Sequence, residues 1–156
     1  MDIRAAMSRK PTFLDFWSLP QEEVSIPAVA ADQALPSITI SGIPSNVVIN
    51  RVVAMFKYRA MENTNAAANK LSGAQEIQVQ KGAGAWADAI NFVADMFGVD
   101  ATTREGGDVF IGAIDLSGTV TADDTYNFQW DEALADLDSI NFNDVQTGLR
   151  IYLRRT

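Results

Sequence analysis

The residues best suited to chemistry in this 156-residue sequence are carboxylates gathered between positions 123 and 144. The stretch contains no lysine or arginine, and its acids are Asp123, Asp124, Asp131, Glu132, Asp136, Asp138 and Asp144. Clustered carboxylate oxygens are the ligands that Ca²⁺ prefers. Asp136 and Asp138 are spaced as at the start of an EF-hand loop, but the glycine and the closing glutamate of such a loop are absent. The stretch therefore predicts a solvated acidic loop, with a calcium site as the alternative.

The residue types that are missing restrict catalysis. The chain has no histidine and no cysteine, which excludes Ser-His-Asp hydrolysis, histidine-based metal sites and thiol nucleophiles. Paired carboxylates can hydrolyse glycosides, but no spacing singles out such a pair here. The segment REGGD at 104–108 lacks the lysine of a phosphate-binding loop and reads as a turn. We therefore expect a protein that is not an enzyme and that has no cofactor.

Three aromatic residues alternate along a third segment of interest, at Tyr126, Phe128 and Trp130. In a strand, residues two apart lie on the same face of the sheet. Such a row most often faces the core, and we expect that here. If the row were exposed, it would instead indicate a carbohydrate-binding or adhesin-type module, which is the alternative function.

Composition and charge restrict the partners. With 156 residues and a hydrophobic fraction of 47%, the chain suits one domain with its own core. A net charge of −8 repels nucleic acid and anionic membranes. No apolar run approaches the roughly 20 residues that cross a bilayer, and residues 1–13 lack the apolar region of a secretory signal. We therefore expect a protein made in the cytoplasm, with neither nucleic acid nor a membrane as its partner.

Short strands are the elements predicted to position these residues. Alternating or β-branched segments fall at 22–28, 37–41, 47–61, 74–81, 109–120, 125–130 and 146–154. Turn residues separate most of them, and no regular alternation of helix and strand occurs. The expected fold class is therefore mostly β, an antiparallel β-sandwich or jelly roll.

One short helix is expected in this fold, over residues 86–97. Four apolar residues recur there at helical spacing: Trp86, Ile90, Val93 and Phe97. The glycine that follows is well placed to end a helix. A strand over part of this segment is the alternative.

Residues 1–21 differ in texture from the rest and predict an extended N-terminal arm, followed by a single sandwich domain at 22–156. The arm carries three large aromatic residues between two prolines, Phe13, Phe16 and Trp17. Neither the strand period nor the helical period fits this segment well. Large aromatics often anchor interfaces because they bury much area at low entropic cost. The two interpretations are packing on the arm's own domain and docking on a neighbouring subunit, and we expect docking.

Basic residues gather at both ends of the chain, while the acids lie between. Arg150 and Arg154 near the C-terminus are suited to pairing with acidic surfaces of neighbouring copies. This self-complementary charge indicates a homo-oligomer. Together with the three arm aromatics, these two arginines form the predicted subunit interface.

Four stretches carry a resemblance to a known group of proteins: NTNAAANKLSGAQEIQVQK, TREGGDVFIG, DTYNFQW and NFNDVQTGLRIYL. They are similar to small proteins encoded among the head and tail genes of tailed phages. The resemblance covers most of the chain from about residue 36. It implies a structural part of the virion: a capsid decoration protein, a minor head protein or a tail component. Copies of itself and other virion proteins such as a major capsid protein are then the expected partners. No functional residue is carried over, because the group has no functional motif to match.

Overall fold

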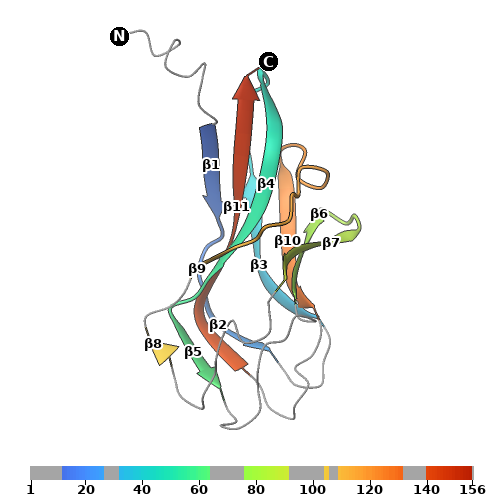
Figure 1. Ribbon diagram of the computed structural model, residues 1–156. Coiled ribbons are helices and arrows are strands. Elements are labelled where there is room, and N and C mark those ends of the chain that lie inside the picture. The colour runs from blue at the N-terminus through green and yellow to red at the C-terminus, as the bar shows by residue number, and fades with distance from the viewer. Residues whose placement is uncertain are drawn as a thin grey trace, which may run out of the picture.

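Two antiparallel sheets make up the computed structural model, which describes residues 12–26, 32–63, 76–91, 104–105, 109–131 and 140–155 (Figure 1). Every regular element in these ranges is a strand. Nothing in them forms a helix that could cross a membrane. The prediction of a mostly-β, antiparallel, two-sheet fold is therefore confirmed for this part of the chain.

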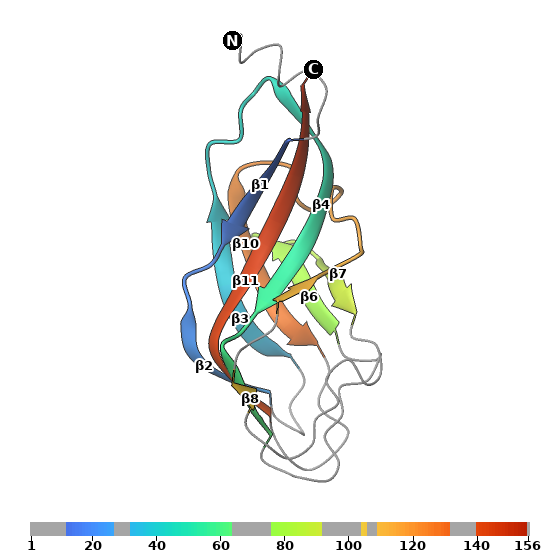
Figure 2. The same cartoon turned by 60° about the vertical axis from the view of Figure 1, so that its left-hand side comes forward.

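The larger sheet has seven strands and is built on its longest one, β11 (Ile140–Arg155). Two strands follow one another along each edge of β11. They are β1 (Thr12–Trp17) and β2 (Gln21–Ile26) on one edge, and β4 (Val47–Lys57) and β5 (Ala60–Asn63) on the other. Two short strands extend the sheet beyond β4 and β5: β9 (Val109–Ile111) and β8 (Arg104–Glu105). Figure 2 shows this sheet lying in front of the smaller one.

Four strands form the smaller sheet, in the order β3, β10, β6 and β7. Their bounds are Gln33–Ile40, Asp124–Asp131, Glu76–Lys81 and Trp86–Asn91. The core lies between the sheets and is rich in aromatic rings, with Phe56 and Phe142 of the larger sheet packed edge to face at 5.6 Å. Trp130 of β10 lies 5.6 Å from Phe142 and is fully buried. Tyr126 and Phe128 are buried with it, so the row Tyr126, Phe128 and Trp130 faces the core as expected. These three rings are not available to bind a sugar.

The expected helix is wrong where the structure describes it, because residues 86–91 form strand β7. Its pairing with β6 contains a β-bulge, so that Ile77 lies opposite Ile90 but Gln78 lies opposite Asp88. The bulge turns both Ala89 and Ile90 into the core, where they are buried. Because two consecutive residues face the core, the apolar residues of this segment do not alternate as in a regular strand. Trp86 and Ile90 stand four apart in the sequence, which is also the spacing of a helix. Residues 92–97 of the expected helix lie outside the described residues.

Residues 12–17, expected to belong to an arm without regular structure, form the edge strand β1. Phe13 lies opposite Tyr152 and Trp17 opposite Gly148, both on β11 of the same chain. The alternation was hidden because apolar residues occupy both faces of β1, Phe13 and Trp17 on one and Phe16 on the other. Residues 1–11 lie outside the described residues, so the arm's boundary stays a prediction.

Candidate interaction surfaces

The outer side of the larger sheet, facing away from the core, carries a group of aromatic and basic side chains. Directly opposed residues of antiparallel strands point to the same side, so the register defines rows across β1, β11, β4 and β9. We call this surface the aromatic face; it comprises Phe13, Asp15, Trp17, Arg51, Val53, Met55, Lys57, Val109, Ile111, Gly148, Arg150 and Tyr152.

Arg150 lies at the centre of one row and is held in a fixed position. Its Nε and Nη2 donate hydrogen bonds of 2.7 and 2.8 Å to the two carboxylate oxygens of Asp15. These bonds raise the pKa of Arg150 above its ordinary value. Its guanidinium also lies 4.5 Å from the centre of the Phe13 ring, which packs in turn 6.0 Å from Tyr152. A bidentate ion pair beneath an aromatic ring fixes all these side chains in one arrangement.

Trp17 covers the next row. A Cβ on Gly148 would lie 2.8 Å from the Trp17 ring and 3.0 Å from the Met55 methyl group, so both side chains occupy the space that this glycine leaves. The Lys57 ammonium lies 4.2 Å from the ring centre of Trp17. Met55 and Val53 are each 2% exposed although they lie on the side of β4 opposite its core residues. The aromatic face therefore has a small apolar cluster of its own.

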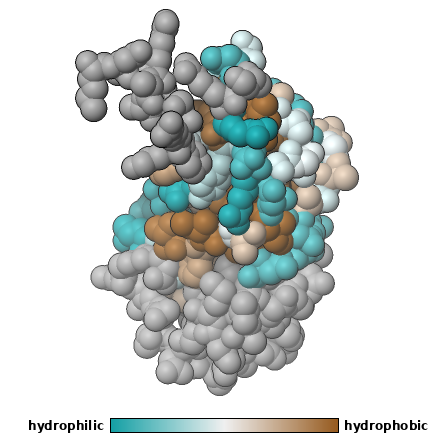
Figure 3. Space-filling view, turned by 45° about the horizontal axis from the view of Figure 1, so that its top comes forward, coloured by the Kyte–Doolittle hydropathy of each residue, from teal (hydrophilic) through white to brown (hydrophobic). Residues whose placement is uncertain are grey.

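Apolar side chains on this face also remain open to solvent. Phe13 is 49% exposed, and Val109 and Ile111 are 60% and 54% exposed. Ile111 lies opposite Met55, which joins it to the row of Trp17 and Gly148. Figure 3 shows hydrophobic side chains at the described surface beside hydrophilic ones. Aromatic residues, methionine and arginine around exposed aliphatic groups are the composition typical of a protein interface.

The predicted interface residues are brought together only in part. Phe13, Trp17 and Arg150 share the aromatic face. Arg154 is exposed further along the same side of β11. Phe16 points the other way and packs, partly buried, against the core. Whether any of them contacts another chain stays a prediction.

The sequence alone missed several members of this face, including Arg51 and Ile111. Each belongs to a strand that is distant in sequence from both termini. Only the register of β4 on β11, and of β9 on β4, brings them beside the residues of β1. A signal did exist in the basic residues Arg51 and Lys57 of an otherwise mainly apolar strand, but it does not say which strands flank β4.

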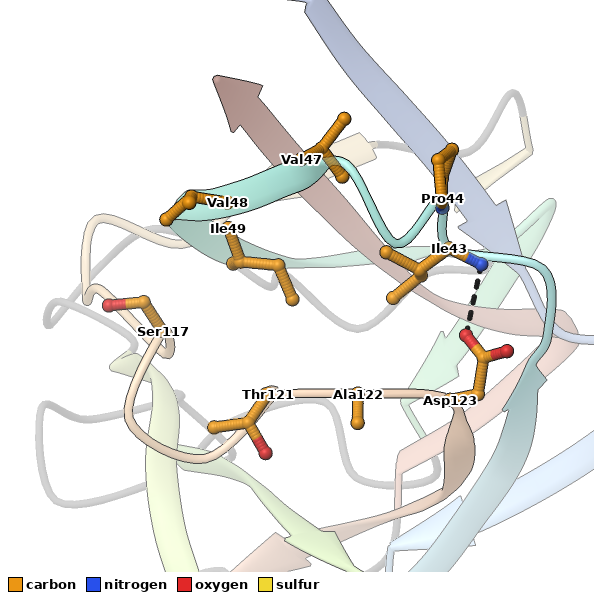
Figure 4. A pocket seen from close by; sticks show the side chains of 9 residues that line it. All are labelled: Ile43, Pro44, Val47, Val48, Ile49, Ser117, Thr121, Ala122 and Asp123. Carbon is orange, nitrogen blue, oxygen red and sulfur yellow. Dashed lines mark hydrogen bonds between the residues drawn. The ribbon is translucent and has the colours of Figure 1, made fainter. Parts of the chain in front are cut away.

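A pocket of about 630 Å³ opens at one end of the sandwich, between the start of β4 and the loop before β10 (Figure 4). Ile43 and Ile49 point into it, and its other lining residues are Pro44, Val47, Val48, Ser117, Thr121, Ala122 and Asp123. The Asp123 carboxylate accepts hydrogen bonds from the backbone N–H groups of Gly42 and Ile43, at 2.7 and 3.0 Å. That carboxylate therefore fastens the turn after β3, and the pocket around it is lined mainly by apolar groups.

The described acids of the stretch 123–144 do not form a metal site. Asp123 fastens the turn just described, and Asp144 pairs with Arg59. Among the described residues no three acidic side chains are close enough to hold a metal ion. Glu132, Asp136 and Asp138 lie outside the described residues, so the calcium alternative is not tested there.

Comparison with known proteins identifies no family for this chain. No family model matches the chain, and no curated protein does. The chain is similar to a solved structure of the infectious bursal disease virus Gx strain, with a TM-score of 0.45 and 10% identity over 93% of this chain. It spans only 33% of that viral chain.

Two further structures belong to different functional classes. One is the capsid of Ralstonia phage GP4, with a TM-score of 0.29, 15% identity, and coverage of 96% of this chain and 86% of that one. The other is the CBM22-1 xylan-binding domain of Paenibacillus barcinonensis Xyn10C, with a TM-score of 0.33, 10% identity, and coverage of 94% and 97%. A virus structure, a phage capsid and a xylan-binding domain thus appear among the neighbours. Similarities at these TM-scores assign no role to the chain.

Proposed function

We propose that this protein is a non-enzymatic structural subunit of a virus particle, either a capsid decoration or minor head protein or a tail component. It assembles with copies of itself and with other virion proteins such as a major capsid protein. The observation that carries the proposal is the aromatic face, which combines fixed aromatic and arginine side chains with solvent-exposed Phe13, Val109 and Ile111. The resemblance of the sequence to phage head and tail proteins supports the same function.

The face has the properties of a preorganised contact. Arg150 is already bonded to Asp15 and Trp17 already packs on Gly148, so few side chains lose rotamer freedom when a partner binds. The exposed apolar groups supply the area that association buries, at about 25 cal/mol for each Å². The cations Arg51 and Lys57 on the same face attract acidic surfaces, and this chain itself carries a net charge of −8.

Two measurements test the proposal. Light scattering of the purified protein is expected to give a mass that is a multiple of 17.0 kDa. Sedimentation of virus particles from the native source is expected to carry the protein with them, at a fixed stoichiometry to the major capsid protein. A protein that is a strict monomer when purified, and that stays in the supernatant when particles sediment, would overturn the proposal.

A further inference from the structure

The outer side of the smaller sheet differs in chemistry from the aromatic face. Its centre consists of amide side chains on two neighbouring strands, with Gln80 opposite Asn127 and Gln78 opposite Gln129. On the edge strand β7, Trp86 lies opposite Gln80 and Asp88 opposite Gln78. We call these residues the amide face: Gln78, Gln80, Trp86, Asp88, Asn127 and Gln129.

Hydrogen bonds fix the orientation of three amides on this face. Gln78 Nε2 donates to the carboxylates of Glu76 and Asp88, at 3.2 and 3.1 Å. Because a carboxylate only accepts, the amide oxygen of Gln78 must point the other way, and it accepts a 2.9 Å bond from Gln129 Nε2. The amide nitrogen of Asn127 is likewise turned inward, to the carbonyl oxygen of Gly82 at 2.9 Å.

Gln80 follows the same pattern, since its Nε2 donates to the carbonyl oxygen of Gly84. One amide N–H of each of Gln80, Asn127 and Gln129 is thus bonded within the protein. No described residue donates to their amide oxygens. The amide face therefore presents a preorganised set of hydrogen-bond acceptors.

An aromatic ring and a lack of positive charge complete the face. Trp86 is 38% exposed beside Gln80, and is the exposed tryptophan of this sheet because Trp130 is buried. Lys81 is the single lysine or arginine in the four described strands, and it donates to Thr121 in the loop before β10. Burial raises the pKa of the Glu76 carboxyl above its ordinary value. Its hydrogen bond with the neighbouring carboxyl of Asp88 raises that pKa further. Anionic ligands such as nucleic acid or charged polysaccharides are therefore disfavoured.

We propose that the amide face binds a neutral polysaccharide. Sugar hydroxyl groups are donors that match the free amide oxygens, and the indole of Trp86 offers an apolar plane on which the C–H face of a sugar ring packs. Four strands spaced about 4.8 Å apart make a platform that accommodates a short oligosaccharide. This site differs from the row of aromatics in β10, which is buried, and its assignment does not depend on the proposed assembly function.

The test is affinity gel electrophoresis against soluble neutral polysaccharides of different backbone, namely xylan, mixed-linkage β-glucan, galactomannan and dextran. At least one is expected to retard the wild-type protein. Trp86→Ala and, separately, Gln80→Ala are expected to weaken that retardation at least tenfold. Tryptophan fluorescence should change on titration of the wild type with the same polysaccharide, and the change should vanish in Trp86→Ala.

Leu19→Ala is the control, because it removes an apolar side chain that is 86% exposed and belongs to neither the amide face nor the aromatic face, and it is expected to leave retardation unchanged. Wild-type mobility that none of the four polysaccharides changes would overturn the proposal, as would undiminished binding by Trp86→Ala. Light scattering of the same variants separates this site from the assembly surface. Loss of oligomers in Trp86→Ala would show that the amide face is a subunit contact and would likewise overturn the proposal.

Discussion

Gly148 is the residue on which the aromatic face depends most directly. Any side chain at this position meets the Trp17 ring and the Met55 methyl group within about 3 Å. The methyl group can turn away, but the indole is rigid and is held beneath the ammonium group of Lys57. The absence of a side chain at 148 therefore sets where Trp17 lies.

Gly148→Ala is predicted to destabilise the fold by ~1–3 kcal/mol, the usual cost of overpacking a filled site. It is also expected to expose Trp17, which a red shift in tryptophan emission would report. Gly118→Ala is the matched control, since nothing lies within 4 Å of a Cβ at that glycine. Thermal melts of both variants decide the matter, and equal melting temperatures would show that the ring moves at no cost.

Asp115 gives the clearest dependence on pH. Burial opposes its ionisation, but its Oδ1 accepts hydrogen bonds from the backbone N–H groups of Val52 and Ser117, at 3.1 and 3.0 Å. The net result is a pKa below the ordinary value of 3.8. A carboxyl whose pKa is lowered by folding stabilises the protein above its ordinary pKa, and that stabilisation is lost as the pH falls through the lowered value.

Asp115→Asn is therefore predicted to lower the melting temperature near neutral pH, by an amount that shrinks as the pH drops below 3.8. Melting curves measured across the acid range test this, with Glu22→Gln on the exposed part of β2 as the control. A difference between Asp115→Asn and the wild type that stays constant down to the lowest pH would contradict the assignment.

At the scale of elements, Thr147 of β11 joins the link between β1 and β2 to strand β3 of the other sheet. Its backbone N–H donates to Ser18 Oγ at 3.1 Å, and its carbonyl oxygen accepts from the Ser18 N–H at 2.9 Å. Its hydroxyl group donates to the carbonyl oxygen of Pro36 in β3, which belongs to the other sheet. Thr147 is fully buried, so none of these groups has water as a substitute partner.

Thr147→Val keeps the shape of the side chain and removes the hydroxyl group. It is predicted to cost ~1–3 kcal/mol, because the part-buried carbonyl oxygen of Pro36 loses its hydrogen-bond donor. Thr39→Val removes a hydroxyl group that bonds Thr125 at the exposed surface, and is expected to change stability little. Denaturant titration of the two variants makes the comparison, and a similar small loss in both would show that water reaches Pro36.

A strand can be predicted from the sequence when one of its faces is apolar and the other is polar. β10 could be predicted because Tyr126, Phe128 and Trp130 alternate with polar residues, and all three are buried. β1 could not, because Phe13 and Phe16 place aromatic rings on both of its faces. The sites could not be predicted for a second reason. The aromatic face combines β1 with strands that are distant in the sequence, and no local pattern encodes the register between them.

At the scale of the whole molecule, the outer sides of the two sheets expose different kinds of side chain. One exposes apolar groups among fixed arginine and aromatic side chains, and the other exposes amide oxygens and acids around Trp86. The sandwich core holds these sides apart, so a change on one is not expected to alter the other. Distant sites that share no partner usually behave additively.

This separation leads to the prediction that tests assembly most directly. Ile111→Asp places a charge on the β9 side of the proposed contact, in the row of Met55, without touching the core. Because Ile111 is 54% exposed, the melting temperature of the dissociated protein is expected to fall little. Burying an unpaired carboxylate in an interface costs several kcal/mol, which is enough to shift an oligomer to the 17.0 kDa monomer in light scattering. Trp86→Ala is the matched control on the opposite sheet and should leave the mass unchanged. Oligomers that survive Ile111→Asp at the wild-type concentration dependence would place the contact elsewhere than on the aromatic face.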